Sequence, residues 1–391
     1  MNDALIGNSE PLSQEAHAAG LEAYRKAGQM RERSIGNRGP LRFGADGKLH
    51  SEILEAFHRQ GFFIFEGVID TEEIASLRCD ANVMLERAPV NRNAKVDAQG
   101  CPALGINYAR LPYRYTKPLA DPWGGTDALG GRHPTQMTQP KPMGDAPEDV
   151  VFIMYSMCQS MPAGLRLYGH PQLLAVAESI NGEDFVPFND AIFVKQPGLG
   201  GSVSWHQDGV THWESPDWDP GIHGFNFQVQ LYPATLGNCL WVVPGSHKRG
   251  RIDIKRQISE NGGSEQLPDA VPLVCKAGDV TIVNRQMLHG SFANSSPDLR
   301  ISLTFGFHRR KSVLGMKAAL AMEDDDVYYD EQRIFERSSV IQVAIDARHQ
   351  ERPTEPRFDY KPFSDIQDDF KFNEETFERV IKDYNTKDLA I

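Results

Sequence analysis

Residues 300–307 read Arg-Ile-Ser-Leu-Thr-Phe-Gly-Phe, with an apolar side chain at every second position from Ile301. Residues 225–231, Phe-Asn-Phe-Gln-Val-Gln-Leu, alternate in the same way. A period of two predicts strands that place one face on a core. Shorter apolar runs at 240–243 and 280–283 lie between them. Many short strands separated by turns predict a mainly β protein, an antiparallel double sheet or barrel of the jelly-roll class, with helices packed outside.

The chain before these strands has helical patterns. A helix is predicted over residues 51–60, where Gly61 can end it, and a strand over residues 62–65, Phe-Phe-Ile-Phe. A capping-box signature begins the next predicted helix, residues 70–85. A further helix is predicted from Pro171 to Ile180. These segments supply the outer helices of the expected fold.

The pattern divides the chain into four parts. Residues 1–48 are polar and weakly periodic, and we expect an arm wrapped on the surface or partly mobile. Residues 49–320 form the main domain, and within it residues 89–150 are aperiodic, as in a functional insertion or lid. Residues 321–391 are expected to be an extension packed on the same domain. The insertion carries basic and aromatic residues suited to a lid: Arg110, Tyr113, Arg114, Tyr115, Lys117 and Trp123.

The composition excludes several classes of function. The chain has 53 acidic and 41 basic residues and a net charge of −12, with no long Lys/Arg run, so nucleic acid is not an expected partner. No stretch approaches the ~18 apolar residues of a membrane span, and a basic leader is not visible, so we expect a cytoplasmic protein. The five cysteines are far apart and show no CxxC spacing, which indicates free thiols.

Two histidines and a carboxylate stand out among the strands. His206 and Asp208 are two residues apart, so on an extended strand both can reach one metal ion, and His289 can complete the site from a neighbouring strand. Two imidazoles and one carboxylate leave coordination positions open, as non-haem Fe(II) needs in order to bind a co-substrate and O₂. The spacing alone has a high false-positive rate, as His212-Trp213-Glu214 and His349-Gln350-Glu351 illustrate.

Ser291 and Arg300, both downstream of His289, strengthen the interpretation as an iron oxygenase. Ser291 follows His289 closely, and Arg300 begins the next alternating strand. The fork of an arginine binds a carboxylate through two hydrogen bonds, which is what anchoring a dicarboxylate co-substrate requires. A surface ion pair is the alternative role for Arg300.

The chain resembles the phytanoyl-CoA dioxygenase family of Fe(II)/2-oxoglutarate oxygenases, which also includes ectoine hydroxylase. The resemblance lies in an ordered set of stretches over residues 51–310: Phe193–Gly198, Trp205–Gly209, Leu240–Lys248, Gly278-Asp279, His289–Ser291 and Arg300. It implies a double-stranded β-helix, the cupin-like jelly roll. Where the family usually reads Asn-Gly before the Pro-Gly-Ser-His turn, this chain has Gly237-Asn238. In that turn His247 is expected to be an exposed histidine.

Carried over one residue at a time, the resemblance puts His206, Asp208 and His289 on the iron ligands. Arg300 and Ser291 fall on the pair that holds the distal carboxylate of 2-oxoglutarate. Lys195 and Asn189, on the preceding strand, can add hydrogen bonds to 2-oxoglutarate or to substrate, or can be structural. Fe(II) is thus the expected metal, with 2-oxoglutarate and O₂ as co-substrates.

The implied activity is a dioxygenase that hydroxylates or otherwise oxidises an unactivated C–H bond of a small molecule and releases succinate and CO₂. Desaturation, cyclisation and epoxidation stay open, as do the substrate and the oligomeric state. Two alternatives remain: a halogenase of the same fold, which Asp208 disfavours, and a jelly-roll metal-binding or sensor protein without turnover. Basic residues in the 89–150 insertion favour an anionic substrate.

Overall fold

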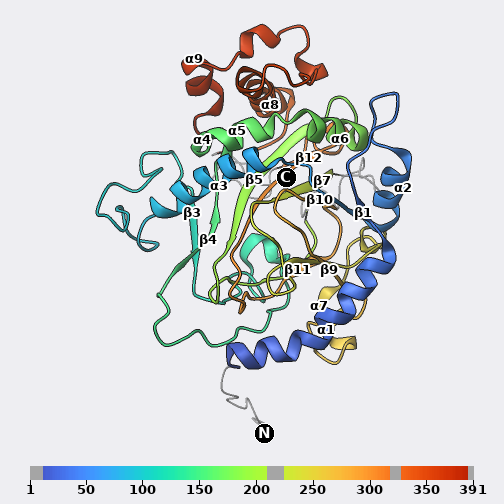
Figure 1. The fold of residues 1–391 in the computed structure, drawn as a ribbon, viewed down its shortest axis with the longest axis vertical. Coiled ribbons are helices and arrows are strands. Elements are labelled where there is room, and N and C mark those ends of the chain that lie inside the picture. Colours follow the sequence, from blue (N-terminus) through green and yellow to red (C-terminus); the bar gives the residue numbers. More distant parts are fainter. Residues whose placement is uncertain (1–11, 209–223, 318–326, 386–391) are drawn as a thin grey trace.

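The computed structural model describes residues 12–208, 224–317 and 327–385, without the side chains of Phe188 and Asn189. Within these ranges the strands form two antiparallel-dominated sheets (Figure 1). The larger sheet has the order β1 (Arg38–Gly39), β2 (Phe62–Phe65), β10 (Val280–Asn284), β7 (Gly224–Gln230), β12 (Arg300–His308), β5 (Val186–Lys195), β4 (Val150–Met154), β3 (Tyr113–Thr116). The smaller has the order β6 (Val203–His206), β11 (His289–Ser291), β8 (Leu240–Val242), β9 (Val271–Leu273). This arrangement is the predicted double-stranded β-helix.

Helices cover the larger sheet on its outer side (Figure 1). Helix α5 packs against α3 and α8, and α8 reaches β5. The helices of the described residues are α1 (Gln14–Ile35), α2 (Ser51–Gln60), α3 (Thr71–Glu86), α4 (Met157–Ser160), α5 (Pro162–Tyr168), α6 (Pro171–Asn181), α7 (Ile254–Glu260), α8 (Glu331–Glu351) and α9 (Glu374–Thr376). None of them is both long and apolar enough to cross a membrane.

Local sequence signals explain the ends of the predicted helices. The Asp70 side chain accepts a hydrogen bond from the Glu73 N–H at 2.7 Å and begins α3. Gly61 ends α2 with φ of 84°, a conformation that glycine adopts without strain. The helices predicted over residues 51–60, 70–85 and 171–180 are therefore confirmed to within a residue or two at each end.

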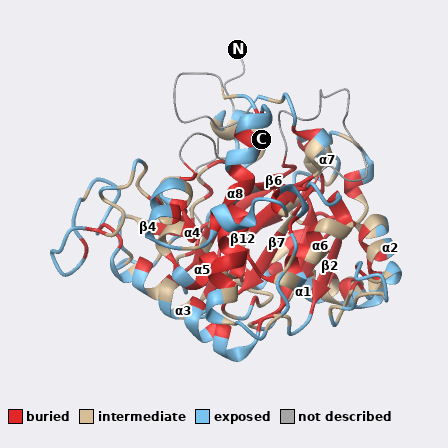
Figure 2. Ribbon diagram, turned by 90° about the horizontal axis from the view of Figure 1, so that it is seen from above, coloured by how far each residue is buried: buried red, intermediate tan, exposed pale blue. Residues whose placement is uncertain are grey.

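The two faces of the larger sheet differ in chemistry. Phe305 and Phe307 of β12 point to the helices, where they pack on Tyr168 of α5 at 5.3 and 5.8 Å between ring centroids. The polar residues of the same strand, among them Ser302, point the other way, toward the interior of the barrel. Figure 2 shows the resulting buried layer between sheet and helices. Alternation thus separates a helix-covered core from a polar interior.

Within residues 1–48, for which we expect an arm wrapped on the surface or partly mobile, residues 14–35 form a regular helix, α1. The helix packs beside β9, and its Tyr24 stacks on Trp241 of the neighbouring strand β8 at 4.6 Å between ring centroids. A Cβ at Gly28 would lie 2.7 Å from the Trp241 ring, so only glycine allows this approach. The periodicity is weak because the buried stripe of α1 includes a histidine, a glycine and a glutamate besides Leu21.

The aperiodic segment 89–150 also contains regular structure. Tyr113–Thr116 forms β3, the edge strand next to β4. Farther along the segment, the side chain of Asp121 accepts hydrogen bonds from the N–H groups of Gly124 and Met137 at 3.0 and 2.9 Å, and Trp123 is 4% exposed. This part of the segment is therefore held by hydrogen bonds and packed against the domain.

The C-terminal segment is joined to the domain by buried polar contacts. Arg348 of α8 binds Glu73 of α3 through both Nη atoms, at 2.7 and 3.0 Å. Tyr384 donates a hydrogen bond to Asp190 of β5, and Asn385 donates another at 3.1 Å. The last described residues thus lie against a strand of the central sheet.

Candidate metal centre and active site

His206, Asp208 and His289 lie together between the two sheets and are all buried. His206 is the last residue of β6 and pairs directly with His289, the first residue of β11. Asp208 follows two residues after β6, and its backbone N–H is held by the carbonyl of Arg285 at 2.9 Å. His206 Nε2 lies 3.7 Å from Asp208 Oδ1, and His289 Nε2 lies 4.0 Å from Oδ2. Three ligand atoms therefore converge from one side.

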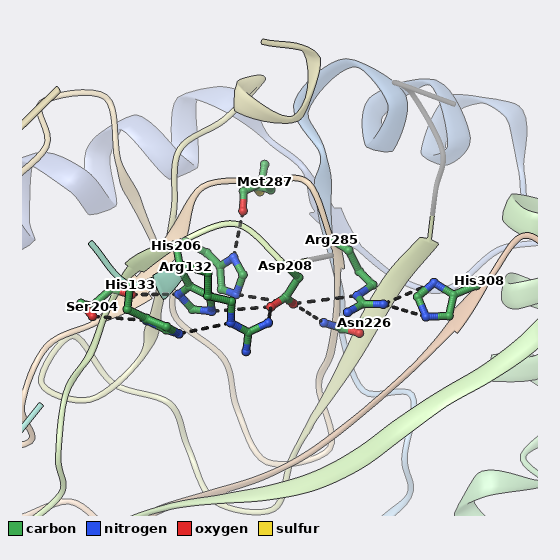
Figure 3. A network of polar contacts seen from close by, with 10 residues as sticks. Arg132, His133, Ser204, His206, Asp208, Asn226, Arg285, Met287 and His308 are labelled. Carbon is green, nitrogen blue, oxygen red and sulfur yellow. Dashed lines mark hydrogen bonds and ion pairs between the residues drawn. The ribbon is translucent and has the colours of Figure 1, made fainter. Parts of the chain in front are cut away.

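Backbone carbonyls orient both imidazoles. His206 Nδ1 lies 2.8 Å from the carbonyl of Ser204, and His289 Nδ1 lies 2.8 Å from that of Met287 (Figure 3). A carbonyl only accepts, so each Nδ1 carries the proton and each Nε2 keeps its lone pair toward Asp208. This is the arrangement of metal-ligating histidines.

Several side chains hold the Asp208 carboxylate (Figure 3). Arg132 Nη1 donates to Oδ1 at 3.0 Å, and Asn226 Nδ2 donates to Oδ2 at 3.0 Å. Nε of the buried Arg285 lies 4.0 Å from Asp208 Oδ2. Nη1 of the same guanidinium lies 2.6 Å from Nε2 of His308. The orientation of the carboxylate is thereby fixed from two sides.

The electrostatics favour the metal-binding protonation states. Burial lowers the pKa of His206 well below its ordinary value, and the nearby His289 lowers it further. Burial likewise lowers the pKa of His289. Burial alone would raise the pKa of Asp208, but Arg132 and the other neighbouring cationic groups hold it below the usual range. Neutral imidazoles and an ionised carboxylate are the forms that bind a divalent metal.

A cavity of about 150 Å³ joins this group to Arg300. Arg300 is 2% exposed; Nη1 donates to the carbonyl of Asn238 at 2.8 Å, and Nη2 donates to Gln228 Oε1 and Ser302 Oγ at 3.1 Å each. Among the described residues no carboxylate pairs with it, and its Nε has no hydrogen-bond partner. Burial lowers the pKa of Arg300 to about 10. A buried cation without an anion in the protein suits a carboxylate that arrives with a ligand.

The other predicted site residues have different environments. Ser291 is buried and lines the cavity. Lys195 lies opposite Arg300 in the β5–β12 register, lines the same cavity and donates to the carbonyl of Phe292. Asn189 belongs to β5, but its side chain lies outside the described residues. Burial and the nearby Arg300 lower the pKa of Lys195 well below its ordinary value.

The donor set fits an iron and 2-oxoglutarate site. Two imidazoles and one carboxylate leave open coordination positions on the cavity side, as a non-haem Fe(II) oxygenase needs. Arg300 lines the same cavity and offers a buried guanidinium that pairs with no carboxylate of the described residues. A metal site and a cation in one cavity match the two ends of a keto dicarboxylic acid.

Sequence reasoning missed several site residues. Asn226 and Gln228 occupy the polar positions of an alternating strand, which the pattern alone does not distinguish from a solvent-facing side; here they face the cavity. Uncharged polar residues at every second position were the available signal. The sequence around Arg132 and His133 contains no such signal. In the structure His133 is fully buried and stacks on His206 at 4.1 Å between ring centroids.

Three other histidines, His212, His247 and His349, stand in motif-like stretches of the sequence. His247 is buried, not exposed as predicted, because its Nε2 donates to the carbonyl of His58 at 3.0 Å beneath the α2–β2 turn. His349 lies on α8, where residues two apart point to different sides of the helix, so it forms no site with Glu351. His212 lies outside the described residues.

The chain is a double-stranded β-helix protein with a buried His-Asp-His group that can hold a metal ion. Comparison with known proteins identifies its family. The sequence profile of the phytanoyl-CoA dioxygenase (PhyH) family matches residues 57–302, more than half of the chain. The chain belongs to the phytanoyl-CoA dioxygenase family. This confirms the resemblance in the sequence and makes the protein by class a 2-oxoglutarate-dependent non-haem iron oxygenase.

Individual relatives match over different lengths. A phytanoyl-CoA dioxygenase of Arabidopsis thaliana is 24% identical over 66% of this chain and 88% of its own length. Ectoine dioxygenase of Halomonas elongata is 24% identical over 68% of this chain and 72% of its own length. Phytanoyl-CoA dioxygenase 1 of Oryza sativa is 35% identical over 28% of this chain, and the match spans only 40% of that relative. A solved structure of EctD from S. alaskensis, with 2-oxoglutarate and 5-hydroxyectoine, has a TM-score of 0.47 at 19% identity, over 70% of this chain and 81% of EctD.

Proposed function

We propose that the protein hydroxylates, or otherwise oxidises, an unactivated C–H bond of a small molecule, using Fe(II), 2-oxoglutarate and O₂ and releasing succinate and CO₂. The observation that carries this proposal is a cavity lined both by His206, Asp208 and His289 and by Arg300, which pairs with no carboxylate of the described residues. The retained Asp208 supports an oxygenase over a halogenase, in which a small residue would leave room for halide.

Each residue has a role in this proposal. His206, Asp208 and His289 hold the iron, and Arg300, with Ser291, holds the far carboxylate of 2-oxoglutarate. Lys195 is close enough to Arg300 in the sheet register to bind the same carboxylate. Asn189 of β5 is kept as a candidate for a further hydrogen bond.

The surrounding residues prepare the site. Arg132 and Asn226 each donate a hydrogen bond to a different oxygen of Asp208, which fixes the orientation of the carboxylate toward the site that would hold iron. Trp123 and His133, both nearly or fully buried, exclude water beside His206. Iron with 2-oxoglutarate, when bound, supplies the oxidising chemistry; the protein supplies orientation and a dry cavity.

The 89–150 segment forms part of the wall of the cavity in this proposal, with residues such as Arg114 and Trp123 facing substrate. Limited proteolysis in the presence of iron, 2-oxoglutarate and substrate tests whether the segment also acts as a lid. Protection only when substrate is present supports a lid, whereas equal cleavage in every state leaves a fixed wall. We further propose a cytoplasmic location, which the five free cysteines support.

The test of the function is a panel assay that includes acyl-CoA esters, amino acids and natural-product intermediates. Each is scored by succinate release above the uncoupled rate and by the mass of the product. A gain of one oxygen indicates hydroxylation or epoxidation, a loss of two hydrogens indicates desaturation or cyclisation, and a halogenated product indicates the halogenase. No iron-dependent succinate with any substrate, or without one, would favour the metal-binding or sensor alternative.

A further inference from the structure

We propose that Arg114 binds a carboxylate of the substrate, and that the substrate is a small organic acid with an apolar or aromatic body. The inference rests on the proposed function, because it assigns the substrate end of the same cavity. Four observations support it: the position of Arg114 in the sheet, its lack of an anionic partner among the described residues, the partners of the other charged side chains in the cavity, and the apolar side chains that line the cavity beside Arg114.

The sheet register directs Arg114 into the cavity. Arg114 of β3 lies opposite Ile153 of β4, and Ile153 lies opposite Phe193 of β5. Residues directly opposite each other in neighbouring strands point to the same face, and all three line the cavity. Two strand spacings, about 10 Å, therefore separate the backbones of Arg114 and Phe193, and the side chains of all three residues form one wall of the cavity.

Arg114 is held by an aromatic face rather than by an acid. Its Cζ lies 5.1 Å from the centre of the Trp123 ring, and it forms no ion pair or hydrogen bond with another described residue. Arg92, in the same segment, instead grips Asp149 with Nε 3.0 and 2.9 Å from the two oxygens. Arg110 resembles Arg114: its Cζ lies 4.6 Å over the Tyr155 ring, and its Nη1 is buried without a partner. Arg110 and Arg114, unlike Arg92, thus do not simply neutralise the acidic excess of the chain.

The arginines that line the cavity differ in their partners. Among the described residues, Arg132 is paired with Asp208, and Arg300 lines the part of the cavity that the proposed function assigns to 2-oxoglutarate. The other lining carboxylate, Asp190, accepts hydrogen bonds from Tyr384 and Asn385. Arg114 has no anion among the described residues, so it can bind the carboxylate of a substrate.

The wall beside Arg114 is apolar. Trp123, Leu129, Ile153, Tyr155 and Phe193 line this part of the cavity. A guanidinium at one edge of such a wall fixes the direction of an acid whose body lies on the apolar side chains, so that its C–H bonds face the metal ligands. A charged hydrogen bond of this kind should make an acid bind about 10- to 100-fold more tightly than its neutral amide.

The test uses three acids of increasing length, phenylacetate, 3-phenylpropionate and 4-phenylbutyrate, with their primary amides. Binding to the full chain is measured by calorimetry under anaerobic conditions with saturating Fe(II) and 2-oxoglutarate. The variants are Arg114→Gln and, as a matched control, Arg256→Gln, which changes an exposed arginine of α7 that forms an ion pair with Glu260 of the same helix. We expect the wild type and Arg256→Gln to prefer at least one acid about tenfold or more over its amide, and Arg114→Gln to lose that preference.

Three results would overturn the assignment: no acid of the series binds the wild type, acids and amides bind it equally, or Arg114→Gln keeps the preference. If Arg114→Gln does not fold, Arg114→Lys replaces it; this variant keeps the charge but loses the fork, so it should reduce the preference, and an unchanged preference would count against the proposal. If the wild type prefers the acids but binds neither Fe(II) nor 2-oxoglutarate, the proposed function fails while the role of Arg114 stands.

Discussion

Replacement of Arg300 by leucine tests the 2-oxoglutarate site at its most buried point. The guanidinium donates to two neutral side chains and one backbone carbonyl, so its charge is without an anion among the described residues. Removing one partner of a buried ion pair typically costs about 3–5 kcal/mol. At about 1.4 kcal/mol per factor of ten, Arg300→Leu should weaken 2-oxoglutarate binding by about 10²- to 4 × 10³-fold.

The assay for this variant follows uncoupled succinate formation against 2-oxoglutarate concentration and needs no known substrate. Iron content, measured on the same preparation, serves as the internal control, because the ligands His206, Asp208 and His289 are untouched. Arg300→Lys keeps the charge but loses the planar fork and should fall between the two. The reasoning is refuted if Arg300→Leu retains iron and shows the wild-type Michaelis constant for 2-oxoglutarate.

Three further changes have defined outcomes. His289→Ala should abolish stoichiometric Fe(II) binding and activity, and wild-type metal affinity in this variant would exclude it as a ligand. Glu73→Gln removes one of the two acids that bind Arg348 and should lower the unfolding free energy in urea by about 1.5–3 kcal/mol, because Arg348 keeps its contacts with Glu355, whereas Glu22→Gln, in an exposed pair, should change it by under about 1 kcal/mol; equal effects would contradict this. Burial, with a smaller contribution from Arg348, lowers the pKa of His170 to about 3. Between that value and about 6.5 the unfolded chain binds the proton and the folded protein does not, so stability should fall on acidification by up to about 1.4 kcal/mol per pH unit, and His170→Phe should show a shallower slope; identical slopes would disprove it.

Features with short-range causes could be predicted from the sequence. Asp70 caps α3 through a contact three residues away, and Gly61 ends α2 through its own backbone conformation. The period of two in β7 and β12 follows from one covered face of the sheet. The relation between His206 and Asp208 is also local, although β6 ends at His206 and Asp208 reaches the site from the residues just beyond.

Features that depend on long-range packing could not be predicted. Helix α1 buries a glycine against Trp241, more than 200 residues away in sequence, and a glycine gives no apolar signal in a periodicity. Arg132 meets Asp208 only because the 121–137 turns fold back over β6. The direction of Asn226 was ambiguous for a different reason, since alternation does not say whether the polar face meets water or a cavity.

The most direct test of the account is a crystal structure of the protein grown anaerobically with Fe(II) and 2-oxoglutarate. The account predicts one metal ion bonded to Nε2 of His206, Nε2 of His289 and a carboxylate oxygen of Asp208, with the far carboxylate of 2-oxoglutarate on the Arg300 guanidinium. A metal held by other residues, or a 2-oxoglutarate whose far carboxylate lies away from Arg300, would contradict it.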